Sequence, residues 1–142
     1  MVAADVDPNQ PLDVRFAGGD APPFAGSIIA PPALTMIEPP CFTGASACPP
    51  FDRSRDLAVR WTVADGFVRI DVRKPADTII AAHCVFDARA GLGVIPRALV
   101  PPLGKVSLWV HTYAATTIRG ADGSALHLRV DAPSKEWTFV DR

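Results

Sequence analysis

Three cysteines are the most reactive side chains of the sequence. Cys41 and Cys48 enclose six residues, and a disulfide between them is expected to stabilise this loop by roughly 2–3 kcal/mol because it restricts the unfolded chain. In a second pairing, Cys84 joins Cys41 or Cys48 and ties the loop to a predicted strand. In the third alternative the thiols are reduced, and Cys84 is a small buried hydrophobic residue. The spacing predicts no zinc site, because no paired His or Cys follows at finger distance.

A second group of side chains predicts a binding surface. Trp109, His111 and Tyr113 share one face of a predicted strand over residues 106–113, and the opposite face is aliphatic. If the aliphatic face lies in the core, the aromatic face is exposed and suited to sugar rings or a partner protein. The alternative is that a second sheet or the Pro-rich N-terminal segment covers it. The three residues are therefore the candidate ligand-binding residues.

Catalysis is not predicted, because the usual arrangements of reactive groups are missing. Cys84 would need a neighbouring imidazole to lower its thiol pKa, but His83 is adjacent in a strand and points to the opposite face. Ser107, His111 and Asp131 can be assembled into a triad on paper, yet no Gly-x-Ser-x-Gly turn accompanies them. We therefore expect a protein with no enzymatic activity, cofactor or metal ion.

Alternating apolar and polar residues predict the strands that position these side chains. Residues 57–63 and 67–73 alternate with a period of two, which indicates strands with one buried and one solvated face. Asp65 and Gly66 lie between them and predict a hairpin, and Trp61 falls on the buried face. Further strands are predicted over residues 13–17, 34–37, 77–86, 106–113, 126–131 and 137–140. In the strand 77–86, the face that runs from Ile80 to Phe86 is expected to be buried. A helical turn is predicted at residues 96–100, and a second hairpin turn at residues 120–123.

Composition limits the class of protein. Fifteen prolines, mostly in doublets, exclude long helices from the first fifty residues. The net charge is −1 and no basic stripe is present, so nucleic acid is not an expected partner. No run of eighteen apolar residues predicts a membrane span.

The expected location depends on indirect signals. Residues 1–13 lack the layout of a signal peptide, so either the protein stays inside the cell or an export signal precedes them. Strands, Pro-rich loops and closely spaced cysteines favour export. We therefore expect an extracellular, periplasmic or cell-envelope protein whose partner is another protein or a carbohydrate.

Length and strand number predict one domain. We expect an all-β, antiparallel, immunoglobulin-like or fibronectin type III-like β-sandwich over residues 24–142. An extended Pro-rich leader over residues 1–23 is expected to precede it.

Two segments resemble known β-sandwich proteins. The segment 57–72 resembles the second and third strands of fibronectin type III domains, through Leu-Ala-Val-Arg-Trp-Thr at 57–62, Gly66 and a Val-Arg-Ile-Asp-Val run. In that family such a tryptophan anchors the sandwich core, which implies this role for Trp61. The segment 84–99 is similar to parts of uncharacterised secreted bacterial β-sandwich proteins, which implies an envelope or extracellular location and no particular activity. The tyrosine-centred motif that fibronectin type III domains have in their sixth strand is missing from this sequence.

These features lead to two functional hypotheses. The first is a non-enzymatic structural or adhesive module of an exported or cell-envelope protein. The alternative is a carbohydrate- or peptide-binding module that uses Trp109, His111 and Tyr113. The two hypotheses differ in whether the Trp109 side chain is accessible to a ligand.

Overall fold

The computed structural model describes residues 7–19, 22–38, 52–73, 80–101, 104, 106–120, 122–132 and 135–139. Within these ranges the chain forms antiparallel strands and two single-turn 3₁₀ helices, with no α-helix. The prediction of an all-β antiparallel protein is confirmed. The elements are β1 (Pro11–Phe16), β2 (Phe24–Ile29), β3 (Met36–Glu38), β4 (Leu57–Trp61), β5 (Phe67–Arg73), β6 (Ile80–Asp87), η1 (Ala88–Ala90), β7 (Leu92–Ile95), η2 (Arg97–Leu99), β8 (Val106–Arg119), β9 (Ala125–Asp131) and β10 (Lys135–Phe139).

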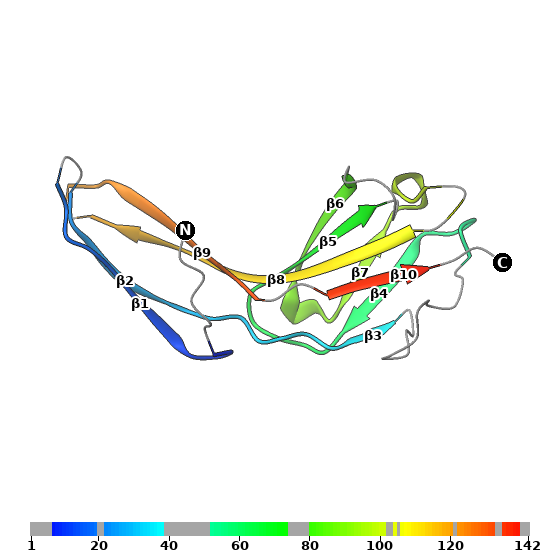
Figure 1. Cartoon of the computed structure of the whole chain (residues 1–142), viewed down its shortest axis with the longest axis horizontal. Helices are drawn as coiled ribbons and strands as arrows, with labels where there is room; N and C mark the ends of the chain where they lie inside the picture. Colours follow the sequence, from blue (N-terminus) through cyan, green and yellow to red (C-terminus); the bar gives the residue numbers. More distant parts are fainter. Residues whose placement is uncertain are drawn as a thin grey trace.

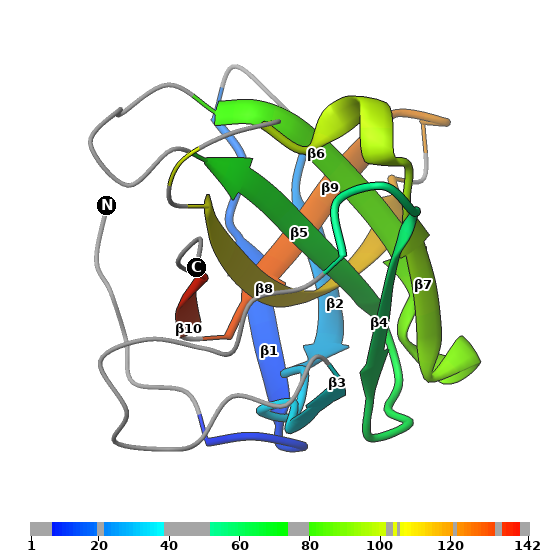
Figure 2. The same cartoon turned by 90° about the vertical axis from the view of Figure 1, so that its right-hand side faces the viewer.

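Two sheets form the larger part of the molecule, which we call the body. One sheet has the order β10-β8-β5-β6, and the other has the order β3-β4-β7. Figure 2 views the body end-on, with the β5–β6 and β4–β7 pairs visible. Side chains of both sheets meet in one core. The main core residues are Leu57, Val59 and Trp61 of β4, Val68, Ile70 and Val72 of β5, Ile95 of β7, and Val106, Leu108 and Val110 of β8.

Trp61 lies at the centre of this core. Its side chain is 2% exposed, and its indole Nε1 donates a buried hydrogen bond to the Ala88 carbonyl at 2.9 Å. The ring also packs near Phe86, with centroids 5.7 Å apart. The core position predicted for Trp61 is therefore confirmed, and the hydrogen bond satisfies the one polar atom of the indole.

The long strand β8 connects the body to a narrower part, which we call the arm (Figure 1). β8 is 14 residues long. Its first half pairs with β5 and β10, and its second half pairs with β9. The β1–β2 hairpin packs against the β8–β9 half and completes the arm. The molecule is consequently elongated and curved, with one strand shared by both parts (Figure 1).

The arm has a thin interior. Among its described strand residues, only Ile28 is fully buried, and the other inward-facing side chains are half-buried. Its two layers approach closely at Gly26, where a Cβ atom would lie 2.3 Å from the Ile118 side chain. The body therefore holds most of the hydrophobic stabilisation.

The predicted hairpin between residues 57–63 and 67–73 is wrong. β4 pairs with β3 and β7, whereas β5 pairs with β6 and β8, so residues 62–66 cross from one sheet to the other. Val63, predicted to face the core, is 70% exposed on this crossing. Gly66 has a φ of 96°. An Asp-Gly pair indicates that the backbone adopts a positive φ at the glycine. Because a connection between two sheets can require a positive φ as a hairpin turn does, the pair alone does not predict a hairpin.

Several other predictions are confirmed. β8 and β9 form the second predicted hairpin, in which the Gly123 N–H donates to the Gly120 carbonyl at 3.1 Å. The 3₁₀ helix η2 supplies the predicted helical turn. In β6, the Ile80–Phe86 face is directed inward and half-buried, while the opposite face is exposed. The division into a leader (1–23) and a domain (24–142) stays a prediction, and β1 of that leader pairs with β2. No described helix is long and apolar enough to cross a bilayer.

Candidate functional site

Asp71 is the centre of the candidate site. It lies on the outward face of β5, yet it is 0% exposed. In the sheet register it stands opposite His83 of β6 and Trp109 of β8. Arg69 and Arg73 lie two residues away on the same face of β5. These larger side chains surround the short carboxylate and exclude water from it.

Four side chains contact the Asp71 carboxylate. His83 Nδ1 lies 2.8 Å from Oδ1, and His111 Nε2 lies 3.2 Å from Oδ2. Arg69 Nε lies 3.1 Å from Oδ1, and Arg73 Nη2 lies 3.4 Å from Oδ2. One buried carboxylate therefore positions two guanidinium and two imidazole groups.

The charges of the cluster shift two pKa values. Burial works to raise the pKa of Asp71, but the His83 hydrogen bond and the Arg69 charge outweigh it and lower that pKa. Burial and the Arg69 charge lower the pKa of His111, against the pull of Asp71 and Asp131. At neutral pH the cluster therefore holds an ionised Asp71 and an uncharged His111.

The cluster holds more hydrogen-bond donors than Asp71 can satisfy. Arg69 Nε, Arg73 Nε and His111 Nε2 are buried and make no well-directed hydrogen bond. Two of these nitrogens lie within ion-pair distance of the carboxylate, but not in a direction suited to a hydrogen bond. The outward face of β5 and β8 therefore has a surplus of donors and positive charge.

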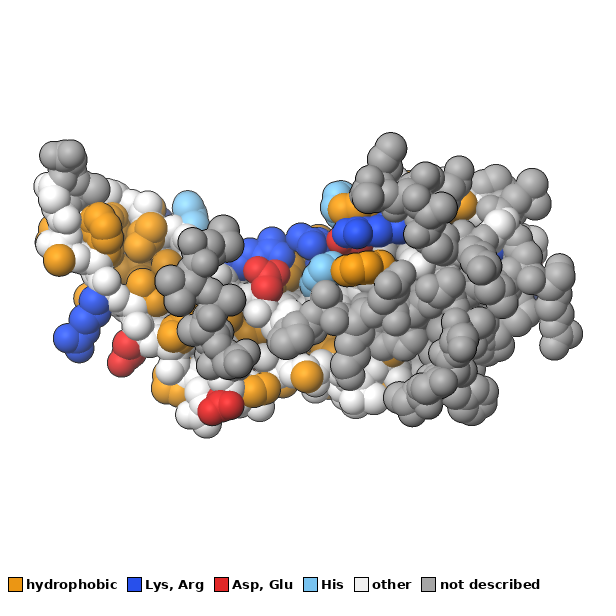
Figure 3. Space-filling view, in the orientation of Figure 1, with side chains coloured by type: hydrophobic (Ala, Val, Ile, Leu, Met, Phe, Trp, Pro, Cys, Tyr) orange, Lys and Arg blue, Asp and Glu red, His pale blue; other side chains and the backbone are white. Residues whose placement is uncertain are grey.

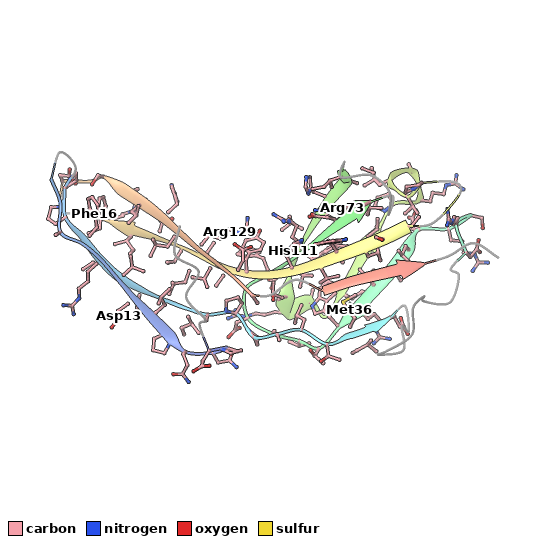
Figure 4. All side chains as sticks on the ribbon, in the orientation of Figure 1. Asp13, Phe16, Met36, Arg73, His111 and Arg129 are labelled. Carbon is pink, nitrogen blue, oxygen red and sulfur yellow. The ribbon has the colours of Figure 1, made fainter. Side chains whose placement is uncertain are left out.

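The predicted binding residues lie beside this cluster. The Arg73 guanidinium is 4.5 Å from the centroid of the Trp109 ring, whose centroid is 6.4 Å from that of His111. Tyr113 stacks on Phe67 at 5.2 Å, and the Arg129 guanidinium lies 4.1 Å from the Tyr113 ring. Figure 4 shows Arg73, His111 and Arg129 on the same side of the sheet.

Trp109, His111 and Tyr113 thus share one face, as the sequence predicts, and all three are half-buried. Within the described part of the chain, arginine side chains lie over the Trp109 and Tyr113 rings. The sequence predicted either an exposed face or cover by a second sheet or the Pro-rich N-terminal segment. In Figure 3 the surface is hollowed between arm and body, and basic, histidine and hydrophobic side chains gather there. We call this surface the concave face; its residues are Phe67, Arg69, Asp71, Arg73, His83, Trp109, His111, Tyr113, Arg129 and Asp131.

Sequence reasoning missed the residues that organise this face. It assigned Arg69, Asp71 and Arg73 to a solvated strand face without a role. The available signal was the Arg-x-Asp-x-Arg spacing, which places two guanidinium groups on either side of one carboxylate in a strand. The contribution of His83 had no comparable signal, because it depends on the pairing of β6 with β5.

The cysteines are separate from the concave face. Cys84 is a free thiol that packs against the core from the inward face of β6. Its bridge to Cys41 or Cys48, predicted as one alternative, is therefore not formed in this structure. Burial raises the pKa of the Cys84 thiol, which keeps it protonated at neutral pH. Cys41 and Cys48 lie outside the described residues, so a bridge between them stays a prediction.

The contacts of the described residues show which chemistry the cluster offers. His83 is held by a buried carboxylate, as a general base would be, but no described hydroxyl or thiol is hydrogen-bonded to it. No described group of three or more His, Cys, Asp or Glu side chains is arranged to hold a metal ion. The chemistry that this geometry offers is recognition of anionic groups by arginine and imidazole.

Comparison with known proteins adds no further constraint. No protein-family model, curated protein or solved structure matches this chain.

Proposed function

We propose that this chain is a non-enzymatic recognition module of an exported or cell-envelope protein, and that its concave face binds an acidic carbohydrate. The observation that carries the proposal is the arrangement of guanidinium groups over Trp109 and Tyr113. Arginine presents a planar fork that matches a carboxylate, and the Trp109 and Tyr113 rings support the two guanidinium groups through cation–π contacts.

The charge of the concave face supports an anionic ligand. Arg69, Arg73 and Arg129 face two carboxylates, those of Asp71 and Asp131. These three guanidinium groups exceed the two carboxylates by one positive charge. Because Asp71 is buried beneath the side chains around it, a ligand cannot contact its carboxylate directly. A carboxylated sugar chain thus meets mainly guanidinium groups.

A carbohydrate is favoured over a peptide by the shape of the surface. The concave face lies on the flat of a sheet, whereas extended peptides commonly add to a sheet edge. Trp109 and Tyr113, the two rings that carry the Arg73 and Arg129 guanidinium groups, lie four positions apart on β8, about 13 Å along the strand. This spacing suits successive units of a rigid, repeating polymer.

The proposal includes the finer fold and the location. We infer an immunoglobulin-like or fibronectin type III-like β-sandwich for the body, supported by two antiparallel sheets that share a core around Trp61. The strand-rich, Pro-rich sequence supports export.

Calorimetric titration tests the proposed ligand. An oligogalacturonate is expected to bind saturably and more weakly as salt rises, while its fully methyl-esterified form does not bind. Arg129→Gln and Arg73→Gln are each expected to weaken binding by about tenfold, the effect of losing one charged hydrogen bond. Arg119→Gln, on the exposed side of β8 in the arm, is the matched control. Equal binding of the esterified form contradicts the proposal, and tighter binding of oligoglutamate indicates a peptide partner.

A structural or adhesive module is the second candidate. It is favoured by the complete burial of Asp71, which joins β5, β6 and β8 through its contacts with His83 and His111. If this is the whole role of the cluster, Arg73→Gln lowers the melting temperature and no acidic oligosaccharide binds.

A further inference from the structure

The outer edge of β1 is open in the part of the chain that the structure describes. β1 pairs with β2 along its whole length, from Pro11 opposite Ile29 to Phe16 opposite Phe24, without a bulge. No other described strand pairs with it. An open edge presents unpaired N–H and C=O groups to another strand. Many proteins protect such an edge with a bulge or an interior proline, and β1 has a proline only at its first position.

β1 carries opposite charges on either side of Val14. Asp13 and Arg15 are both exposed, and neither forms an ion pair with another described residue. Figure 4 shows Asp13 directed away from the interior of the arm. If β1 carried charges of one sign only, they would repel the β1 strand of a second copy in every pairing register. Asp13 and Arg15 have opposite signs, so two copies of β1 repel each other in some registers and attract each other in one.

The attractive register is antiparallel and centred on Val14. In it, Asp13 of each copy lies opposite Arg15 of the other, which gives two ion pairs related by a twofold axis. A shift of two residues places Asp13 opposite Asp13, or Arg15 opposite Arg15. A shift of one residue places outward polar side chains opposite those that face the arm's interior. The Val14-centred register alone matches both charge and polarity.

An exposed aromatic side chain supports the same register. Phe16 is 48% exposed at the end of β1 and shares a strand face with Leu12 and Val14. In the Val14-centred pair, Leu12 of one copy lies opposite Phe16 of the other. The pairing therefore covers an exposed ring and extends the thin apolar layer of the arm.

We propose that β1 is a self-association edge, at which two copies of this chain form a twofold dimer by antiparallel β1–β1 pairing centred on Val14. The partner is a second copy of the chain, because an antiparallel copy of β1 places Arg15 opposite Asp13 and Asp13 opposite Arg15. The dimer does not involve the concave face, so it stands or fails independently of the proposed ligand.

Charge exchange tests the dimer in analytical ultracentrifugation of the whole chain. The wild-type protein is expected to dimerise with rising concentration. Asp13→Arg places arginine opposite arginine, and Arg15→Asp places aspartate opposite aspartate. Each single variant is expected to raise the dimer dissociation constant by about tenfold to a hundredfold, because two attractive pairs become repulsive. The double variant D13R/R15D restores the complementary pairs and the wild-type dissociation constant.

Mixing the two single variants gives the sharpest result. The Asp13→Arg variant has two arginines on this edge, and the Arg15→Asp variant has two aspartates at the same two positions. An equimolar mixture is therefore expected to form heterodimers, although each variant alone is monomeric. Arg55→Asp, at a side chain that is 84% exposed elsewhere in the molecule, is the matched control and keeps the wild-type dissociation constant. A monomeric wild type, single variants that dimerise normally, or a mixture that stays monomeric each overturns the proposal.

Discussion

Asp71 illustrates how one side chain organises a surface without reaching solvent. Its carboxylate contacts side chains from β5, β6 and β8. A buried carboxylate is stable only when it is paired, and each of its partners here brings a donor. The same contacts hold the arginines of the concave face in place, so Asp71 is a positioning residue for the proposed ligand.

Replacing Asp71 is expected to destabilise the fold. Asp71→Asn keeps the size of the side chain but removes the charge that balances Arg69 and Arg73. Removal of one member of a buried charge cluster costs about 3 kcal/mol in the free energy of unfolding. Urea denaturation measures this loss. Asp7→Asn, at an exposed position outside β1, is expected to change the free energy by less than about 0.5 kcal/mol, and equal effects of the two substitutions contradict the interpretation.

The lowered pKa of His111 predicts a pH dependence. Burial, followed by the Arg69 charge, holds this pKa below the ordinary value of 6.5. Below pH 6.5 the unfolded chain therefore binds more protons than the folded chain, and the free energy of unfolding falls as the pH drops towards the folded pKa. Asp71, whose folded pKa lies below 3.8, adds a second loss below that pH.

Denaturation curves at pH values from about 7.5 to about 5 check this effect. The loss of stability over this range is expected to be smaller in His111→Gln than in the wild type. His127→Gln, on β9, serves as the matched control. A wild-type pH dependence in His111→Gln would exclude His111 as its source.

At the level of elements, the crossing from β4 to β5 depends on Gly66. The residue has a φ of 96°, and a Cβ there would lie 2.6 Å from the Tyr113 carbonyl oxygen. The second constraint arises because the crossing passes directly against β8.

Gly66→Ala is therefore expected to cost more than a positive φ alone. The strained backbone accounts for about 1 kcal/mol, and the contact with Tyr113 adds to this by displacing backbone. Gly123→Ala is the matched control, because Gly123 has a φ of 85° and no neighbour within 4 Å of an added Cβ. Thermal unfolding compares the two variants, and equal losses would show that the contact relaxes freely.

The elements also show what local sequence can predict. Alternation places Val59, Ile70 and Leu108 in the core because the period belongs to a single strand. It cannot choose the pairing partner, so the 57–63 and 67–73 runs suggested a hairpin although they belong to different sheets. Asp71 was missed for the same reason: its burial depends on neighbours contributed by β6 and β8.

At the scale of the whole molecule, arm and body differ in how much apolar surface they bury. The described arm strands contain one fully buried side chain, that of Ile28, whereas the body has a continuous core. Stability is therefore expected to be uneven along the chain. The arm is the part that opens first.

Hydrogen exchange measured by mass spectrometry checks this expectation. Peptides from β1, β2 and β9 are expected to exchange faster than peptides from β4 and β5 at the same pH. Dimerisation through β1 would slow exchange in β1 and β2 as concentration rises. Uniform protection across all five strands at low concentration contradicts a weaker arm.

The sharing of β8 has a mechanical consequence. Its hydrogen bonds to β5 and β9 run across the strand. A force applied to the tip of the arm along β8 would pull β8 in shear against β5. All hydrogen bonds between the two strands would then bear the force at once and would have to break together. A force on the arm would therefore reach the sheet that carries Asp71 through β8 alone among the strands whose pairing the structure describes.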